Sequence, residues 1–252
     1  MLVFLGIILF VLLVVVHEFG HMVAAKKNGV EVEEFGIGFP PRAKLLGKKN
    51  GTEYTLNWLP IGGFVKLKGE HDDANEKGSF GAAKFSKKAL IIGAGVLMNW
   101  LAAIVIFTII SLLGMPQLIN NQFKISSDAN TIRQEVFAGT VEDDSPAASI
   151  GLKQGDRIIK INNQLVTSGE QLRAATKQYA GQQVSIEFKH DDTKQTKQTM
   201  LRNDPKKGNF GVAPGEQTLV RSTWSAPIVG IGTTAQFTAE TFKGIGSAVG
   251  SL

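Results

Sequence analysis

Two long, almost uncharged runs constrain this chain more than any other feature of its sequence. Between residues 1 and 25 the only charged side chain is Glu18, and residues 89–115 carry no charge at all. Each run exceeds the ~20 residues that a helix needs to cross a bilayer, and apolar side chains occupy every face. A buried helix of a soluble protein is a poor fit, and a cleaved signal peptide would begin with a basic region. The runs therefore predict two transmembrane helices.

The lysines that flank the runs predict an orientation. Lys26 and Lys27 follow the first run, whereas Lys84, Lys87 and Lys88 precede the second. Short loops rich in basic side chains stay in the cytoplasm, so residues 26–88 are predicted to be cytoplasmic. The N-terminus and the segment after Met115 are then expected outside the cytoplasm, in a multi-pass protein of the cell membrane.

The cytoplasmic loop contains two stretches with partial strand character. They are Thr52–Leu59 and Phe64–Leu67, and the turn-forming sequence Pro60-Ile61-Gly62-Gly63 separates them. We expect a β-hairpin that turns at this sequence. Its apolar tip (Trp58, Leu59, Pro60, Ile61 and Phe64) suits contact with the membrane or the helices, although an ordinary cytoplasmic hairpin fits the pattern equally well.

The composition changes to that of a soluble domain after residue 115. Ser145 before Pro146 predicts a helix start, and Ser168 with Gln171 forms a capping box that opens a second helix. Arg157–Ile161 and the alternating residues 184–188 predict strands. A small α+β domain is therefore expected within residues 120–215.

The last segment, residues 222–252, has an amphipathic pattern. Six apolar residues fall near one face of a helix over residues 224–249. These residues are Trp224, Ile228, Ile231, Phe242, Ile245 and Val249. We expect this segment to form a helix at the membrane surface.

The chemistry-bearing motif lies inside the first apolar run. His17-Glu18-Phe19-Gly20-His21 is an HExxH sequence, whose two histidines share one face of a helix and can bind one metal ion. Glu18 follows the first ligand and is placed to act as a general base on a water whose pKa zinc lowers to about 7. Ionisable groups in a membrane span cost several kcal/mol unless they have partners, and Zn²⁺ would supply one. The alternative is a hydrogen-bonded polar cluster between helices.

Composition excludes other chemistries. The chain has no cysteine, so disulfide scaffolds, Cys-ligated zinc, Fe–S clusters and thiol catalysis are excluded. The remaining histidines, His71 and His190, lie in polar segments and are interpreted as solvated surface residues. Lys and Arg lack the local density and aromatic interleaving of a nucleic-acid binder, so no nucleic-acid partner is expected.

Four segments resemble the site-2-protease-type intramembrane zinc metalloproteases, specifically the bacterial group with an inserted PDZ domain that includes the regulator of sigma-E protease. They are residues 14–41, 51–70 and 87–104, together with 139–166 for the PDZ-like part. The resemblance implies a polytopic α-helical membrane protein with a cytoplasmic β-hairpin and an α+β PDZ-like domain. It also implies an endopeptidase that cleaves single-pass membrane proteins, such as anti-sigma factors or remnant signal peptides.

The resemblance also implies roles for individual residues. His17 and His21 would be zinc ligands and Glu18 the general base, while the hairpin would present the substrate backbone to the metal by strand addition. Asn99 falls where the family places a polar residue, to polarise or steady the substrate, although a plain helix–helix hydrogen bond fits equally well. The neighbouring Gly93 and Gly95 are expected to let helix backbones approach closely. Gly62, Gly63 and Phe64 are candidates to contact substrate or support the ligands.

One departure from the family leaves two functions open. The family takes its third metal ligand from an Asp in a later membrane helix, within an LDG-type motif that this sequence lacks, so a C-terminally truncated chain is expected. The first function is an intramembrane zinc endopeptidase in the lipid bilayer. The second is a non-catalytic, membrane-tethered PDZ module that binds peptide tails. HExxH favours the first, and the missing ligand favours the second.

Overall fold

The computed structural model describes residues 2–70, 76–119, 121–191, 193–204 and 207–250. The chain divides into two compact units, residues 1–106 and 107–252, and each is described by itself. His71 lies outside the described residues, so its predicted surface position is not tested.

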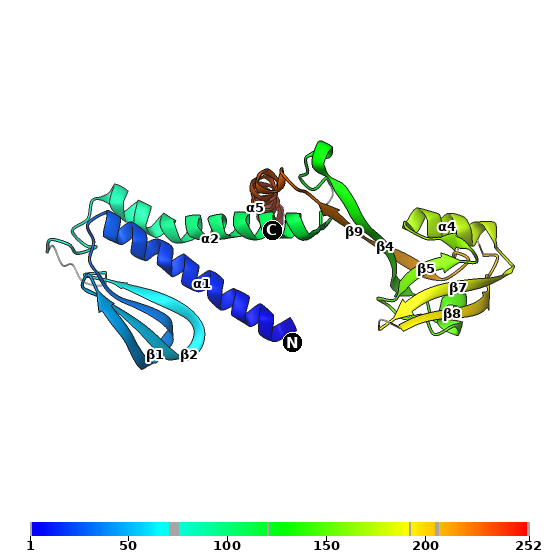
Figure 1. Ribbon diagram of the computed structural model, residues 1–252, viewed down its shortest axis with the longest axis horizontal. Helices are drawn as coiled ribbons and strands as arrows, with labels where there is room; N and C mark the ends of the chain where they lie inside the picture. Colours follow the sequence, from blue (N-terminus) through cyan, green and yellow to red (C-terminus); the bar gives the residue numbers. More distant parts are fainter. Residues whose placement is uncertain (1, 71–75, 120, 192, 205–206, 251–252) are drawn as a thin grey trace. The chain divides into compact units, whose positions relative to one another are not determined.

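The first unit pairs two helices that are long and apolar enough to cross a membrane (Figure 1). They are α1 (Leu2–Lys27) and α2 (Phe85–Leu113), of which α2 continues into the second unit. The helices approach closely at Gly20, where an added Cβ would lie 2.5 Å from the Ala94 carbonyl oxygen and 2.6 Å from Met98 Cγ. A small residue at this position therefore determines how near the two backbones can come.

A bent antiparallel sheet packs against α1 (Figure 1). Its strands are β1 (Val32–Lys49) and β2 (Thr52–Leu67). Residues 32–37 of β1 pair with both halves of β2, and the second half of β1 pairs with residues 52–57. The sheet therefore has four strand segments in the order 63–67, 32–37, 52–57 and 42–49. Residues 63–67 form one of its two edges.

The predicted hairpin turn at Pro60–Gly63 is wrong. The two segments that flank it do not pair with each other, because residues 32–37 lie between them. The hairpin turns instead at Asn50-Gly51, between the paired residues Lys49 and Thr52. Both turn residues have positive φ, 51° and 80°, which is the backbone of a two-residue type I′ turn and the reason that Asn-Gly is favoured there.

The apolar residues 58–64, which the sequence placed at the hairpin tip, lie within β2 away from the turn, and of these, residues 58–61 are exposed. Trp58, Leu59 and Ile61 are 70%, 53% and 60% exposed, whereas Phe64 is partly buried. The opposite face of the sheet contributes Val32, Phe35 and Leu67 to a core with residues of α1 and α2. Sheet and helices therefore share one hydrophobic core.

The second unit contains a seven-stranded sheet within the described residues. Its strands are β3 (Met115–Pro116), β4 (Asn130–Val141), β5 (Arg157–Ile161), β6 (Gln164–Leu165), β7 (Gln183–His190), β8 (Thr193–Met200) and β9 (Val212–Arg221). The order is β3-β9-β4-β5-β7-β8, with β6 paired to β5. The sheet runs from Met115 to Arg221, beyond the expected limits of 120 and 215, because β9 continues along β4 and meets β3.

Two helices cover this sheet and begin where the sequence predicts. In α3 (Pro146–Ser149) the Ser145 hydroxyl accepts from the Ala148 N–H, and in α4 (Gly169–Gln178) the Ser168 hydroxyl accepts from the Gln171 N–H. The core below them includes Val184, Ile186 and Phe188 of β7, as the alternation predicts, together with Ile158, Ile161 and Leu172.

His190 is not the solvated residue that the sequence suggested. Its Nδ1 lies 2.6 Å from an oxygen of the buried Asp156 carboxylate, whose other oxygen accepts from the Lys153 backbone N–H. The strand β7 places His190 beside this carboxylate because it pairs with β5, which begins directly after Asp156.

A buried carboxylate joins the domain to the last helix, α5 (Ala226–Gly250). Asp128, at the end of the 3₁₀ helix η1 (Ser126–Asp128), accepts four hydrogen bonds, from the backbone N–H and the hydroxyl of both Thr223 and Ser225. The Thr223 hydroxyl, followed by the Ser225 groups, holds the pKa of Asp128 well below its usual range. The six apolar side chains predicted to share a face of α5 and its approach are all exposed.

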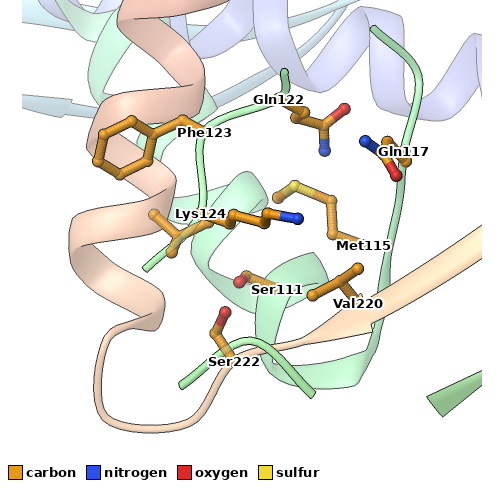
Figure 2. Close-up of a pocket in the computed structure, with 9 residues that line it drawn as sticks. Ser111, Met115, Gln117, Gln122, Phe123, Lys124, Val220 and Ser222 are labelled. Carbon is orange, nitrogen blue, oxygen red and sulfur yellow. The ribbon is translucent and has the colours of Figure 1, made fainter. Parts of the chain in front are cut away.

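A small pocket lies where α2, β3, β9 and α5 meet (Figure 2). The amide groups of Gln117 and Gln122 and the amine of Lys124 surround the thioether of Met115. The buried Ser111 hydroxyl also lines this pocket and has no hydrogen-bond partner among the described residues. Its backbone carbonyl accepts from the Ser222 N–H, which ties the end of α2 to the loop before α5.

Candidate functional site

The HExxH side chains form one cluster on α1. Among the described residues, His17, Glu18 and His21 are the group of potential metal ligands, with their ligand atoms within 4.8 Å of one another. The two histidine Nε2 atoms are 3.1 Å apart. Two nitrogens bound to one tetrahedral zinc ion, each at about 2.05 Å, would be about 3.3 Å apart. The helix therefore presents both nitrogens at the separation that zinc requires.

A backbone carbonyl fixes the tautomer of His21. Its Nδ1 is 2.7 Å from the Ile91 carbonyl oxygen, which can only accept a hydrogen bond. Nδ1 therefore carries the proton, and the lone pair of Nε2 is free for a metal. Metal-binding histidines are commonly oriented in this way by an acceptor behind the ring.

Asn99 takes the corresponding position behind His17. Its Nδ2 lies 3.3 Å from His17 Nδ1, and its Oδ1 is buried with no partner. Rotating the amide by 180° exchanges these two atoms, so that Oδ1 accepts from Nδ1–H. This orientation removes the unsatisfied oxygen and frees the His17 Nε2 lone pair. In this orientation Asn99 would hold His17 in place as a metal ligand, a role beyond the two expected from the sequence, which were a contact that polarises or steadies the substrate and a helix–helix hydrogen bond.

Gly95 leaves the space in front of the two histidines. A Cβ on this residue would lie 2.5 Å from Nε2 of both His17 and His21. The sequence suggested only a packing role for Gly93 and Gly95, and for Gly93 that expectation is wrong, because an added Cβ there has nothing within 4 Å. The donor set, the acceptors behind the rings and the space at Gly95 together fit a zinc ion.

The edge of the hairpin sheet lies beside Glu18. Glu18 and Val65 line the same pocket, and the Cβ position of Gly63 lies 3.9 Å from Glu18 Cγ. Gly62, with φ +82°, packs on Phe39, and Phe64 packs over Gly36 in the neighbouring segment. Of the three candidates from the sequence, Gly63 is the one brought next to the cluster.

A pocket opens from this cluster along the sheet edge. It is lined by Glu18, His21, Val65, Leu67, Glu70, Phe80, Ile91 and Ile92. Glu70 was not singled out from the sequence, and its carboxylate interacts electrostatically with Glu18. The sequence does not indicate that Glu70 lies near Glu18. Glu70 comes three residues after the end of β2, and it reaches this pocket because the chain bends back after Leu67.

A second candidate site lies in the other unit, at the loop 208–211 before β9. All four carbonyl oxygens of this loop accept hydrogen bonds: those of Gly208 and Asn209 from Arg202, that of Phe210 from Ala147, and that of Gly211 from Glu142. Among the described residues, the N–H groups of residues 209–211 donate no backbone hydrogen bond. Consecutive free N–H groups form a binding site for an anion such as a carboxylate.

This loop stands at the end of a groove between α4 and β9. The groove is lined by Leu172, Arg173 and Thr176 of α4 and by Phe210 and Val212 on the opposite side. Among the described residues, residues 212–217 of β9 pair with β4 on one edge and with no strand on the other. The strand β3 pairs with this second edge farther along β9, at Leu219 and Val220. The groove therefore offers an open strand edge beside an anion site.

Comparisons with known proteins place the chain in a family. The sequence model described as Peptidase family M50 matches residues 5–249. A "Putative zinc metalloprotease" of Clostridium perfringens is 36% identical over 198 residues, which cover 78% of this chain and 53% of the relative. One of Clostridium acetobutylicum is 33% identical over 193 residues, covering 75% and 50%. The chain belongs to peptidase family M50, and it spans about half the length of the curated relatives it matches.

Two solved structures are similar to part of the chain. The PDZ domain of an SdrC-like protein from Listeria monocytogenes is 27% identical, with a TM-score of 0.30, over 34% of this chain and 92% of that one. The PDZ domain of an SdrC-like protein from Listeria innocua is 30% identical, with a TM-score of 0.28, over 33% and 93%.

Proposed function

We propose that this member of peptidase family M50 is part of an intramembrane zinc endopeptidase that cleaves single-pass membrane proteins, for example anti-sigma factors or remnant signal peptides. One observation carries the proposal: His17 and His21 direct two Nε2 atoms 3.1 Å apart into a space that only a glycine at position 95 leaves open. The separation of the two Nε2 atoms matches that of two ligands on one tetrahedral zinc ion, and the match to family M50 supports a metal centre over the hydrogen-bonded polar cluster and the non-catalytic alternative.

His17 and His21 would hold the zinc ion, which supplies Lewis acidity at the scissile carbonyl and lowers the pKa of water. Glu18 takes the proton of the attacking water and passes it to the leaving amine. The carbonyl of Ile91 and the amide of Asn99 keep both imidazoles in the tautomer that leaves Nε2 unprotonated. A catalytic zinc site has three protein ligands, so we propose a third ligand outside this cluster.

Substrate would bind as an added strand along residues 63–67. A helical membrane segment must be unwound before its carbonyl reaches the catalytic group, and an open strand edge supplies hydrogen-bond partners for the extended form. Val65 and Glu18 line the same pocket, so a strand on this edge would pass next to the base. The absence of a side chain at Gly63 lets this edge lie close to the Gly36 carbonyl and to Glu18, since an added Cβ would be 2.9 Å from that carbonyl oxygen.

The peptidase proposal is tested with Glu18→Gln. We expect the variant to retain zinc and to lose cleavage by a factor of ~10²–10⁴, because an amide cannot accept the proton of the attacking water. The measurements are metal content and cleavage of a single-span reporter by a chain that includes the third ligand. His17→Ala should instead lower metal content. Cleavage unchanged by Glu18→Gln would contradict the mechanism.

We further propose that residues 115–221 form a PDZ-like domain that captures the C-terminal tail of a peptide. The carboxylate would bind the free N–H groups of residues 209–211, and the tail would add to the open edge of β9 beside α4. The full chain should therefore bind a fluorescent apolar peptide with a free C-terminus, and C-terminal amidation should weaken that binding. Equal binding of the acid and the amide would refute this mode.

A further inference from the structure

A basic pocket lies at the end of the first unit where α1 finishes and α2 begins. Its walls come from residues 28–30 after α1 and residues 77–87 before and within α2. Three lysines line it, namely Lys77, Lys84 and Lys87. The pocket contains no residue of the His17–His21 cluster, and nothing in the proposed peptidase mechanism uses it.

The charge in this pocket is not neutralised within the part of the chain that the structure describes. Among the described residues, no carboxylate lies within ion-pair distance of Lys77, Lys84 or Lys87, and Lys87 Nζ donates to the Asn28 carbonyl oxygen at 2.8 Å. The nearby carboxylates of Glu31 and Glu76 are both bound by Lys68, at 3.3 and 3.7 Å. As far as the described residues go, the three lysines therefore keep their positive charge available for a ligand.

The position of these lysines on α2 adds to the positive potential. The N-terminus of a helix carries a partial positive charge, which acidic side chains normally offset. The first turn of α2 has no acidic residue, and Lys84 precedes the helix while Lys87 lies within it. An anion bound in the pocket would compensate both the lysines and the helix terminus.

The pocket also lies at the boundary of the apolar surface. Phe85, at the first position of α2, is 86% exposed, and Leu90 and Ile92 are each 62% exposed. If α2 spans the membrane, the lysines and Phe85 are level with the lipid headgroups, and Leu90 and Ile92 are level with the start of the acyl region. Basic pockets between membrane helices at this level commonly bind anionic headgroups.

We propose that this pocket binds the headgroup phosphate of an anionic phospholipid. The acyl chains would lie against the exposed apolar side chains at the start of α2. The proposal rests on α1 and α2 being membrane spans but not on peptidase activity. Neither Lys84 nor Lys87 contacts the histidine cluster, so substituting these lysines should leave the zinc content unchanged. Zinc content therefore tests the proposed peptidase function, and lipid binding tests the pocket.

The test is native mass spectrometry of the full chain in detergent micelles, titrated with phosphatidylglycerol, phosphatidylcholine or inorganic phosphate. We expect selective retention of phosphatidylglycerol. The double variant Lys84→Ala/Lys87→Ala should weaken it about 25-fold, at about fivefold per lysine. The matched control Lys177→Ala/Lys197→Ala removes two exposed lysines of the second unit and should not change it. Lys84→Arg/Lys87→Arg should retain binding, which separates charge from folding effects.

Three outcomes would overturn the proposal. Equal retention of phosphatidylcholine would show that apolar contacts alone hold the lipid. Inorganic phosphate binding as tightly as phosphatidylglycerol would assign the pocket to a soluble anion. Unchanged binding in Lys84→Ala/Lys87→Ala, or an equal loss in the control, would remove the pocket as the binding site.

Discussion

Substituting Gly95 by alanine isolates the requirement for space at the metal centre. The added Cβ would lie 2.5 Å from Nε2 of both histidines, whereas ordinary van der Waals contact begins at 3.4 Å. The imidazoles or the helix backbones must therefore move by about 0.9 Å. Zinc–ligand distances in working sites vary by only about 0.2 Å, so the displacement is several times what the coordination tolerates.

The size of the effect follows from comparable changes at other zinc sites. Loss of the groups that orient zinc ligands typically costs 10- to 100-fold in metal affinity, and a direct clash should cost at least that much. Helix propensity acts in the opposite direction, because Gly→Ala in a helix interior gains about 1 kcal/mol. Zinc affinity should therefore fall while the helix itself becomes no less stable.

Gly93→Ala is the matched control, because the same substitution two residues away meets nothing within 4 Å. Zinc affinity is measured on both variants by competition with a chelator, and helix content by circular dichroism. We expect Gly93→Ala to match the parent chain and Gly95→Ala to lose zinc with unchanged helix content. Equal zinc affinity of the two variants would refute the assignment of this space to a metal.

Three further predictions test other parts of the structure. Asn99→Asp keeps an acceptor behind the metal-binding ring and should retain zinc, whereas Asn99→Leu should lower zinc affinity 10- to 100-fold in the same competition assay. Asp128 has a lowered pKa, so its contribution to stability is present above the ordinary pKa of about 4 and is lost as the pH falls below that value. The Asp128→Asn variant should therefore have a lower melting temperature at pH 7, and its melting temperature should fall less steeply as the pH is lowered. A melting temperature that falls with pH as steeply as in the parent chain would contradict this. For topology, a cysteine at Lys177 should react with an impermeant reagent in intact cells and one at Lys48 should not, and the reverse labelling would invert the orientation.

Much of the fold could be predicted because its signals are local. The Ser145 and Ser168 caps, the strand Arg157–Ile161 and the alternation in β7 each depend on neighbouring residues, and each is present in the structure. The apolar runs predicted α1 and α2 for the same reason. A local signal was also available at Asn50-Gly51, but the hairpin turn was predicted from the proline and glycines at 60–63 alone.

The environment of the histidines could not be predicted, because it depends on distant pairs. Ile91 and Asn99 lie 70 and 82 residues from the histidines that they contact. Gly93 and Gly95 look alike in the sequence, and only the rotation of α2 about its axis decides which of them faces the cluster. His190 was misjudged for the same reason, since Asp156 reaches it through the pairing of β5 with β7.

The contact between α1 and α2 would serve packing and metal binding at once. Gly20 lets α1 approach the α2 backbone at Ala94, which is adjacent in sequence to Gly95, and the Ile91 carbonyl and Asn99 amide lie on either side of that point. A change that separates the two helices therefore moves both hydrogen-bond acceptors away from the histidines. The same change widens the space between the histidines and α2. In a bilayer, where apolar burial gives helices no extra attraction for each other, close packing and polar contacts hold such a pair together. The residues that would orient the zinc ligands are thus the same ones that hold the helix pair, and zinc binding should in turn stabilise the contact between α1 and α2.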